Sequence, residues 1–345
     1  MSSKTAFVTG IFGQDAAYLS KLLLDKGYRV IGAHRRTSTN NSWRLKELGI
    51  ENEIEFVEFE LIEFSNILRA IEKAAPDEIY NLAAQSFVGS SFEQPIYTAD
   101  ADALAVTRIL EAIRTINPSI RFYQASTSEM YGKVAEEVQS ETTPFHPRSP
   151  YGVAKLYGHW ITRNYRESWD IFATSGILFN HESPLRGTEF VTRKITTGLA
   201  QIKSGQIKHL ELGNIAAKRD WGHARDYVEG MYKMLQQDTP DDFVLATGET
   251  HTIENFADCA CEAAGFKVEW VGEGLGRRAI DRSSGNDLIR INEKFFRPAE
   301  VDVLRGSAAK AKSVLGWEPQ TNFRQLIDEM MEADLRRETN GIALI

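Results

Sequence analysis

The chain begins with an arrangement that suits few folds: an apolar run, a turn with two glycines and a helical pattern, in that order. Residues 4–9 read KTAFVT, which is typical of a short strand, and residues 14–26 carry apolar side chains at helical spacing. Gly10 and Gly13 lie between these segments. Glycine lets the backbone approach a pyrophosphate closely, and N–H groups at a helix start point toward anions. Ala16 replaces the third glycine of this pattern, and its methyl group suits a helix–strand contact.

Strand-like and helix-like segments alternate through the first half of the chain. This alternation predicts an α/β fold built on a Rossmann-type, doubly wound parallel sheet. Such sheets bind ligands outside the carboxyl ends of their strands. We therefore expect one crevice formed by loops 10–15, 34–38, 60–61, 81–86 and 127–129. The expected strands are 4–9, 28–34, 53–59, 78–82, 121–126 and 172–178, and the expected helices are 14–26, 65–74, 95–116 and 151–168.

The regular alternation stops after residue 180. Residues 204–222 and 272–290 are rich in glycine and charge, and helical patterns return at 255–264 and 323–337. This predicts a smaller, interleaved C-terminal α/β lobe that binds the substrate. The dinucleotide-binding domain is expected to cover 1–180 and roughly 220–250, and the substrate lobe roughly 181–219 and 251–345.

The segment after the second predicted strand selects the dinucleotide. A carboxylate there favours NAD, because it accepts a hydrogen bond from the ribose 2′-hydroxyl, whereas arginine accommodates the 2′-phosphate of NADP. The chain offers Arg35 and Arg36, and no acidic residue follows before Glu47. NADP is therefore the expected cofactor.

The composition is that of an ordinary globular chain. Its 345 residues are 42% hydrophobic, enough for a large core, and the formal charge of −8 argues against nucleic-acid or membrane-surface binding. We find no leader-like segment and no apolar run long enough for a membrane span, so a cytoplasmic enzyme is the expectation. Cys259 and Cys261 are two residues apart on a predicted helix and project to different faces. Neither a disulfide nor a metal site is therefore expected.

A tyrosine and a lysine four residues apart make a candidate proton-transfer pair. Ser149 and Pro150 are typical of an N-cap and a first helical position, so Tyr151 falls in the first turn of a helix. Lys155 shares its helix face, and an adjacent ammonium favours the phenolate. Tyr151 is thus a candidate base near neutral pH.

Together these elements resemble the extended short-chain dehydrogenase/reductase family and, within it, the GDP-mannose 4,6-dehydratases. The resemblance runs from about residue 4 to about residue 335. The blocks that carry it are QASTSEMYG (124–132), PRSPYGVAKLY (147–157), ILFNHESPLRG (177–187), FVTRK (190–194), AKRDWG (217–222) and RPAEVD (297–302).

The resemblance implies a three-part reaction: oxidation of the hexose at C4, loss of water across C5 and C6, and return of the hydride to C6. Tyr151 would take the C4 hydroxyl proton, while Lys155 would lower the tyrosine pKa and hold the nicotinamide ribose. Thr127 would hydrogen-bond the developing C4 carbonyl. Glu129 would remove the C5 proton and protonate the leaving C6 hydroxyl.

The resemblance also implies two sets of binding residues and a homodimer or homotetramer. In the family, the arginine-rich segment at 35–36 reaches a neighbouring subunit. The chain departs from the family pattern at Glu60, where aspartate is usual, and at Ala105, where glycine is common. The implied cofactor contacts are Gly10, Ile11, Phe12, Gly13, Gln14, Asp15, Arg35, Arg36, Glu60, Leu61, Leu82, Ala83, Ala84, Gln85, Ser86, Tyr97, Tyr151, Lys155, His181 and Arg186. The implied GDP-sugar contacts are Ser86, Ser128, Glu129, Asn180, Val191, Lys194, Arg219, Arg297 and Glu300, the last as the reader of guanine.

Two alternatives stay open at this point. The same chemistry acts on another sugar if the pocket is wider near C2 or C6, as for GDP-N-acetylglucosamine or a GDP-heptose. A redox-silent NADP-binding regulator needs the glycine turn but has no use for Tyr151, Lys155 and Glu129.

Overall fold

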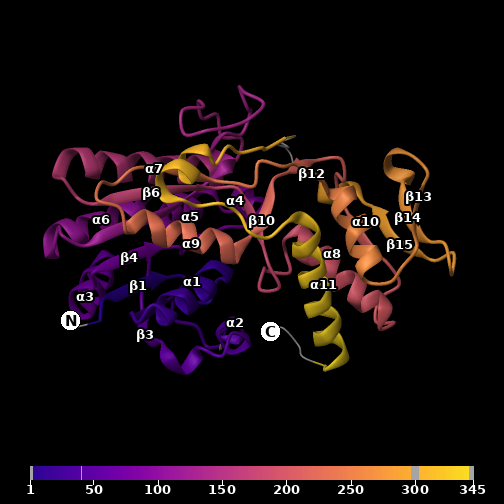
Figure 1. Ribbon diagram of the computed structural model, residues 1–345, viewed down its shortest axis with the longest axis horizontal. Helices are drawn as coiled ribbons and strands as arrows, with labels where there is room; N and C mark the ends of the chain where they lie inside the picture. Colours follow the sequence, from indigo (N-terminus) through magenta and orange to yellow (C-terminus); the bar gives the residue numbers. More distant parts are fainter. Residues whose placement is uncertain (1–2, 40, 297–302, 342–345) are drawn as a thin grey trace.

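The computed structural model describes residues 3–39, 41–296 and 303–341 and is centred on a seven-stranded parallel sheet (Figure 1). The strand order is β11-β6-β5-β4-β1-β2-β3, and every neighbouring pair is parallel. This confirms the predicted Rossmann-type sheet. The strands are β1 (Thr5–Thr9), β2 (Arg29–His34), β3 (Glu55–Glu58), β4 (Glu78–Asn81), β5 (Arg121–Thr127), β6 (Ala173–Leu178) and β11 (Phe243–Leu245).

Helices cover both faces of this sheet. On one face, Ala6 and Val8 of β1 pack in a core with α1 (Gln14–Asp25) and α9 (Ala224–Leu235). On the other, Phe7 packs with α3 (Phe64–Ala74), α6 (Ala105–Ile116) and α7 (Pro150–Trp169). Successive side chains of a strand point to opposite faces, so strands buried on both sides read as continuous apolar runs.

The predicted helix at 95–116 is divided into three parts. It consists of α5 (Pro95–Ala99), a π-helical turn (Asp100–Leu104) and α6. The wider turn places the Asp102 carboxylate where its Oδ1 accepts the Gln85 N–H at 2.7 Å. The segment after β4 also contains α4 (Val88–Glu93).

A second lobe, at the right of Figure 1, has its own core of helices and strands. Its sheet has the order β13-β14-β15-β8, in which β15 and β8 are parallel and the other pairs antiparallel. The stretches 204–222 and 272–290, which are rich in glycine and charge and for which no strands were predicted, contain short strands with charged residues. The elements are α8 (Val191–Lys203), α10 (Ile253–Ala263), α11 (Phe323–Thr339), β8 (Leu210–Leu212), β13 (Val268–Val271), β14 (Arg278–Asp281) and β15 (Asp287–Ile291).

Short strands connect the two parts. β7 (Asn180–Glu182) follows β6 almost directly and pairs with β10 (Trp221–His223), while β9 (Lys218–Arg219) pairs with β12 (His251–Thr252). The domain boundaries given above stay a prediction. The remaining segments are α2 (Trp43–Glu47), 3₁₀ turns at Glu51–Glu53, Ser128–Met130, Gly274–Gly276 and Glu293–Phe295, and a π turn at Ala311–Leu315.

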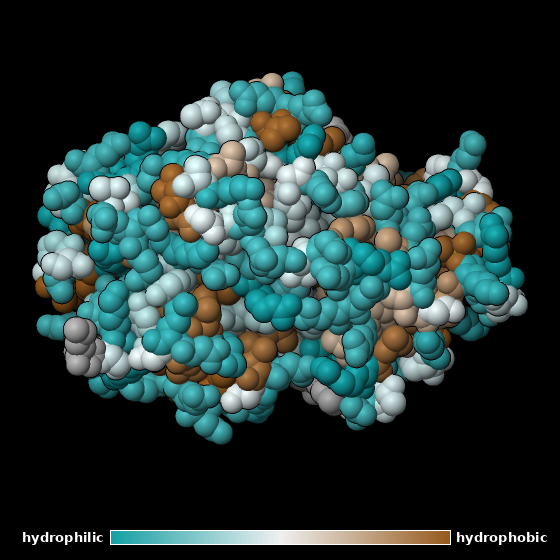
Figure 2. Space-filling model, viewed as in Figure 1, coloured by the Kyte–Doolittle hydropathy of each residue, from teal (hydrophilic) through white to brown (hydrophobic). Residues whose placement is uncertain are grey.

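The surface is largely polar. In the view of Figure 2, hydrophilic residues cover most of the molecule and hydrophobic residues form separate patches. Within the described residues, no helix combines the length and apolar character needed to cross a membrane.

Candidate active site

A small pocket lies at the carboxyl ends of β5 and β6 and brings together the four residues expected to act on the substrate. Its volume is about 120 Å³. Ligand pockets usually measure about 300–1,000 Å³, so this one is large enough only for a reacting group. The lining residues are Asp15, Leu82, Ala84, Ser86, Ala125, Ser126, Thr127, Ser128, Glu129, Tyr151, Lys155, Leu178, Phe179, Asn180, His181 and Arg186.

The start of α7 delivers Tyr151 to this pocket. The Ser149 hydroxyl accepts the Gly152 N–H at 3.0 Å and Pro150 takes the first helical position, which confirms the predicted cap. Gly152 has a further role that sequence reasoning missed. A Cβ there would lie 2.9 Å from the Glu129 carbonyl oxygen, so only glycine lets α7 approach the turn that carries Glu129 this closely.

Thr127 ends β5 and caps the following 3₁₀ turn. Its backbone is extended, and its hydroxyl accepts the Glu129 N–H at 3.3 Å. This bond orients the turn that carries Ser128 and Glu129 at the carboxyl end of β5. Thr127, Glu129 and Tyr151 therefore converge from β5, the 3₁₀ turn and α7, with Glu129 partly exposed.

Electrostatics around Tyr151 differ from the sequence-based expectation. Burial is the main cause that raises the pKa of Tyr151. The negative charges of Asp102 and Glu129 raise this pKa further, and a hydrogen bond with Thr127 lowers it. Lys155 Nζ lies 5.8 Å from the tyrosine ring centroid and donates to the Ala125 carbonyl at 3.0 Å. In the protein alone the pKa of Tyr151 is raised, mainly by burial, and the expected lowering by the Lys155 ammonium is not seen.

Lys155 itself is buried beside acidic groups. Burial lowers its pKa, while Asp102 and Asp15 oppose this change. Asp102 is a residue that sequence reasoning missed: burial raises its pKa to about 6, against the attraction of Lys155. The available signal was the position of Asp102 between Ala101 and Ala103, two residues after Asp100, in a helical segment with many apolar residues.

Asp15 and His181 form an ion pair at one side of the pocket. His181 Nε2 lies 2.8 Å from Asp15 Oδ2, and the imidazole Nδ1 lies 2.7 Å from the Phe179 carbonyl. Burial opposes both charges, but attraction prevails: the pKa of Asp15 falls to about 2 and that of His181 rises. Arg186 completes this side, stacked over Phe190 with 3.6 Å from guanidinium carbon to ring centroid.

The glycine turn has the geometry that a dinucleotide needs. Gly10 has φ +68°, and a Cβ built on it would lie 2.9 Å from the Ala83 Cα. The Gly13 N–H closes the turn on the Gly10 carbonyl at 2.8 Å, and no side chain caps the start of α1. Its first N–H groups are therefore available to an anion. Ala16 is buried without disturbing the turn.

The other candidate cofactor residues lie around this turn. Ile11 is buried in the core and Phe12 is partly exposed. Arg35 and Arg36 are exposed beyond β2; Arg35 Nη1 lies 3.4 Å from the Tyr97 hydroxyl, and Arg36 Nε lies 3.7 Å from Glu58. Glu60 and Leu61 follow the neighbouring strand β3, and Leu82, Ala84 and Ser86 line the pocket, whereas Gln85 does not.

The candidate GDP-sugar residues are brought together only in part. Ser86, Ser128, Glu129 and Asn180 line the small pocket. Val191 begins α8, and Lys194 borders a separate cavity of about 830 Å³ with its ammonium 3.6 Å from the Phe295 ring centroid. Arg219 is buried on β9 and donates to the Lys218 carbonyl at 2.9 Å. Arg297 and Glu300 lie outside the described residues.

The fold and the pocket define a class of protein. A parallel dinucleotide-binding sheet, a glycine turn at α1, and a tyrosine and lysine one helical turn apart at the carboxyl edge are the features of a short-chain dehydrogenase/reductase. Among the described residues, no group of three or more histidine, cysteine or acidic side chains has the geometry to hold a metal ion.

Comparison with known proteins narrows this class. A family model described as GDP-mannose 4,6 dehydratase matches residues 7–330, and the chain belongs to that family. It is 51% identical over 339 residues to GDP-mannose 4,6-dehydratase of Sinorhizobium fredii strain HH103, covering 96% of this chain and 97% of the relative. It is 48% identical to GDP-mannose 4,6 dehydratase of Homo sapiens, with 96% and 91% covered.

Solved structures share the fold. The dTDP-glucose 4,6-dehydratase of Bacillus anthracis in complex with NAD aligns with a TM-score of 0.80 at 20% identity, covering 98% of both chains. RMD of Pseudomonas aeruginosa complexed with NADPH aligns with a TM-score of 0.76 at 21% identity, covering 97% of this chain and all of that one. These likenesses establish the architecture.

Proposed function

We propose that the chain converts GDP-D-mannose to GDP-4-keto-6-deoxy-D-mannose by internal hydride transfer with bound NADP, for deoxyhexose synthesis. The observation that carries the proposal is one pocket lined by Thr127, Glu129, Tyr151 and Lys155 in a chain that belongs to the GDP-mannose 4,6-dehydratase family. About 50% identity to named dehydratases over nearly the whole chain supports the same reaction.

The residues that would hold NADP fit the group. The uncapped start of α1 and the Gly10 turn suit the diphosphate, and Arg35 and Arg36 suit the 2′-phosphate. Bound NADP would supply the hydride acceptor for C4 of the sugar and, once reduced, the hydride donor for C6. The bound cofactor would therefore be in its oxidised form again after each turnover.

Tyr151 would act on the C4 hydroxyl. Its phenol stands at the pocket with the Thr127 hydroxyl beside it, so one side chain can take the proton while the other hydrogen-bonds the forming carbonyl. Lys155, one helical turn away, would stabilise the phenolate with its positive charge.

Glu129 would carry out the elimination. Oxidation at C4 makes the C5 proton acidic, because the carbanion is delocalised as an enolate, and a carboxylate can take that proton and pass one to the C6 hydroxyl. Asp15 is the other acidic residue among those lining the pocket, but its pKa of about 2 makes it a poor proton donor near neutral pH. A 4-epimerase needs no such carboxylate, so Glu129 favours a dehydratase.

The nucleotide half of the substrate would lie toward the second lobe. Lys194 and Arg219 supply cations there, and arginine suits a diphosphate because it donates two parallel hydrogen bonds. No contact among the described residues favours GDP-N-acetylglucosamine or a GDP-heptose over GDP-mannose.

We also propose that the protein is a cytoplasmic homodimer or homotetramer. Val153, Tyr157 and Trp160 form a stripe on α7, and they are 56%, 40% and 48% exposed. Exposed apolar stripes of this kind mark contact surfaces. Cys259 and Cys261 are free thiols, as expected in a reducing compartment. Light scattering of the purified protein tests the association.

The reaction is tested by incubating purified protein with GDP-mannose and NADP. We expect a 4-keto-6-deoxy product with no net NADPH. Stoichiometric accumulation of NADPH would instead indicate a simple dehydrogenase. Parallel reactions with GDP-N-acetylglucosamine and a GDP-heptose test which sugar is the substrate. If either is turned over faster than GDP-mannose, it is the substrate instead of GDP-mannose.

A further inference from the structure

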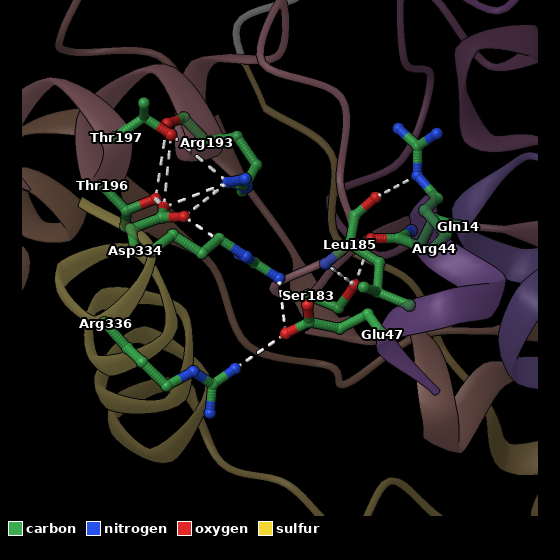
Figure 3. A network of polar contacts seen from close by, with 11 residues as sticks. Gln14, Arg44, Glu47, Ser183, Leu185, Arg193, Thr196, Thr197, Asp334 and Arg336 are labelled. Atoms are coloured by element: carbon green, nitrogen blue, oxygen red, sulfur yellow. Dashed lines mark hydrogen bonds and ion pairs between the residues drawn. The ribbon is translucent and has the colours of Figure 1, made fainter. Parts of the chain in front are cut away.

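Arg44 on α2 joins two segments that both carry candidate cofactor contacts. Its Nη1 donates to the Phe12 carbonyl at 2.7 Å, and its Nε donates to the Leu185 carbonyl at 2.6 Å. Phe12 belongs to the glycine turn, and Leu185 lies between the pocket residues His181 and Arg186. Figure 3 shows the hydrogen bond from the Arg44 guanidinium to the Leu185 carbonyl.

The bond to Phe12 completes the fixation of one peptide group. The N–H of the peptide between Phe12 and Gly13 donates to the Gly10 carbonyl at 2.8 Å, while its carbonyl accepts from Arg44. Both edges of the peptide are therefore held. Since this peptide immediately precedes α1, its orientation determines where the first helical N–H groups point.

The bond from Arg44 to Leu185 adds to three polar links that join α1 to the segment from β7 to Leu185. Gln14 accepts a hydrogen bond from the Ser183 hydroxyl at 2.7 Å and donates to the His181 carbonyl at 3.1 Å. Asp15 pairs with the His181 ring. Arg44 fixes the C-terminal end of the same segment through the Leu185 carbonyl, next to Arg186.

Arg44 is charged and largely shielded from water. Burial lowers its pKa to about 10, so the guanidinium stays protonated at neutral pH. Its guanidinium carbon lies 4.4 Å from the Trp43 ring centroid, and within the described residues it has no carboxylate at ion-pair distance. Glu189 and Asp15 attract this positive charge without an ion-pair contact, and it lies beside the glycine turn, where an anion would be stabilised.

The second lobe fixes the helix that carries Arg44. Glu47, three residues later, accepts from Arg336 at 2.7 Å and Arg337 at 3.2 Å. Arg337 in turn donates to Asp334, which also accepts from the buried Arg193 at 2.9 Å (Figure 3). Helices α2, α8 and α11 are thus connected by one network of charges.

We propose that Arg44 is a positioning residue for the dinucleotide: it fixes the glycine turn against the segment carrying His181 and Arg186, so that both meet the cofactor diphosphate in one arrangement. The inference rests on the proposed function only in taking NADP as the dinucleotide. Nothing in the residue pattern of α2 pointed to this role, because the bonds go to backbone carbonyls.

The test compares nucleotide binding by wild type, Arg44→Met, Arg44→Lys and the control Arg324→Met, an exposed arginine of α11 paired with Glu262, after removal of bound nucleotide. Titration calorimetry measures NADP and adenosine 2′-monophosphate, which lacks the diphosphate. We expect Arg44→Met to weaken NADP binding about tenfold, or about 1.4 kcal/mol, with adenosine 2′-monophosphate unchanged. Arg44→Lys should recover only part of the loss, because one ammonium cannot hold both carbonyls in the same geometry.

Several results would overturn the inference. An unchanged NADP dissociation constant in Arg44→Met, an equal loss for adenosine 2′-monophosphate, or an equal loss in Arg324→Met would each do so. Full recovery by lysine would show that charge alone matters. If wild type itself fails to bind NADP, the cofactor assignment fails instead, and the two failures are distinguishable.

Discussion

Replacing Gly10 with alanine tests the close contact between the glycine turn and the loop after β4. A Cβ on Gly10 would lie 2.9 Å from the Ala83 Cα, and the residue has φ +68°. The left-handed conformation costs an alanine about 1–2 kcal/mol, and overpacking adds about 1–3 kcal/mol. We expect Gly10→Ala to reduce the free energy of unfolding by about 2–5 kcal/mol. It should also weaken NADP binding, because the turn or the Ala83 backbone must move.

Gly27 supplies a matched control. It has φ +81°, but a Cβ there would meet nothing within 4 Å. Gly27→Ala therefore carries the conformational cost alone, about 1–2 kcal/mol, and should leave NADP binding unchanged. Urea denaturation measures both stabilities, and calorimetry measures NADP binding. Equal losses in the two variants would refute the claimed contact with Ala83.

Three further experiments test other parts of the account. Arg35→Ala with Arg36→Ala should weaken NADP by about 1.5–3 kcal/mol per lost charged hydrogen bond and NAD little; equal losses in calorimetry would contradict 2′-phosphate recognition. Asp334→Asn should cost about 3–5 kcal/mol in urea denaturation, because buried guanidinium groups lose their carboxylate, while the exposed Asp328→Asn should change little. Asp15 has its pKa lowered from 3.8 to about 2, so its stabilisation holds above pH 4 and is lost toward pH 2. The stability gap to Asp15→Asn, about 2 kcal/mol at pH 5, should therefore shrink on acidification.

Six of the seven strands of the central sheet could be predicted because their signals are local, whereas the three-residue strand β11 was not expected. Strands buried on both faces read as apolar runs, and the turn at Gly10 reads directly from the sequence. The second lobe could not be predicted in the same way. Its strands β8, β14 and β15 are three to five residues long and carry charges, and β15 pairs with β8 across some eighty residues of chain.

The candidate site, too, could be predicted from the sequence only in part. The cap at Ser149 and the turn from Tyr151 to Lys155 follow from helix periodicity, so their geometry was predictable. The raised pKa of Tyr151 was not, because it arises from burial and from Asp102, which a π turn places nearby. The role of Arg44 was not predictable either, because its hydrogen bonds go to backbone carbonyls. Every residue has such a carbonyl, so the sequence does not show which ones accept.

The variant Glu129→Gln tests the central claim most directly, because it separates oxidation from elimination. Glutamine keeps the shape of the side chain but cannot take a proton, so dehydration should fall by about 10²–10⁴-fold. Oxidation at C4 depends on Tyr151 and should survive. After mixing with GDP-mannose, the account predicts reduced-nicotinamide absorbance on the enzyme, no 6-deoxy product and no exchange of the C5 hydrogen with deuterated solvent. Tyr151→Phe should show neither absorbance nor product. Product formation and C5 exchange by Glu129→Gln at the wild-type rate would contradict the account.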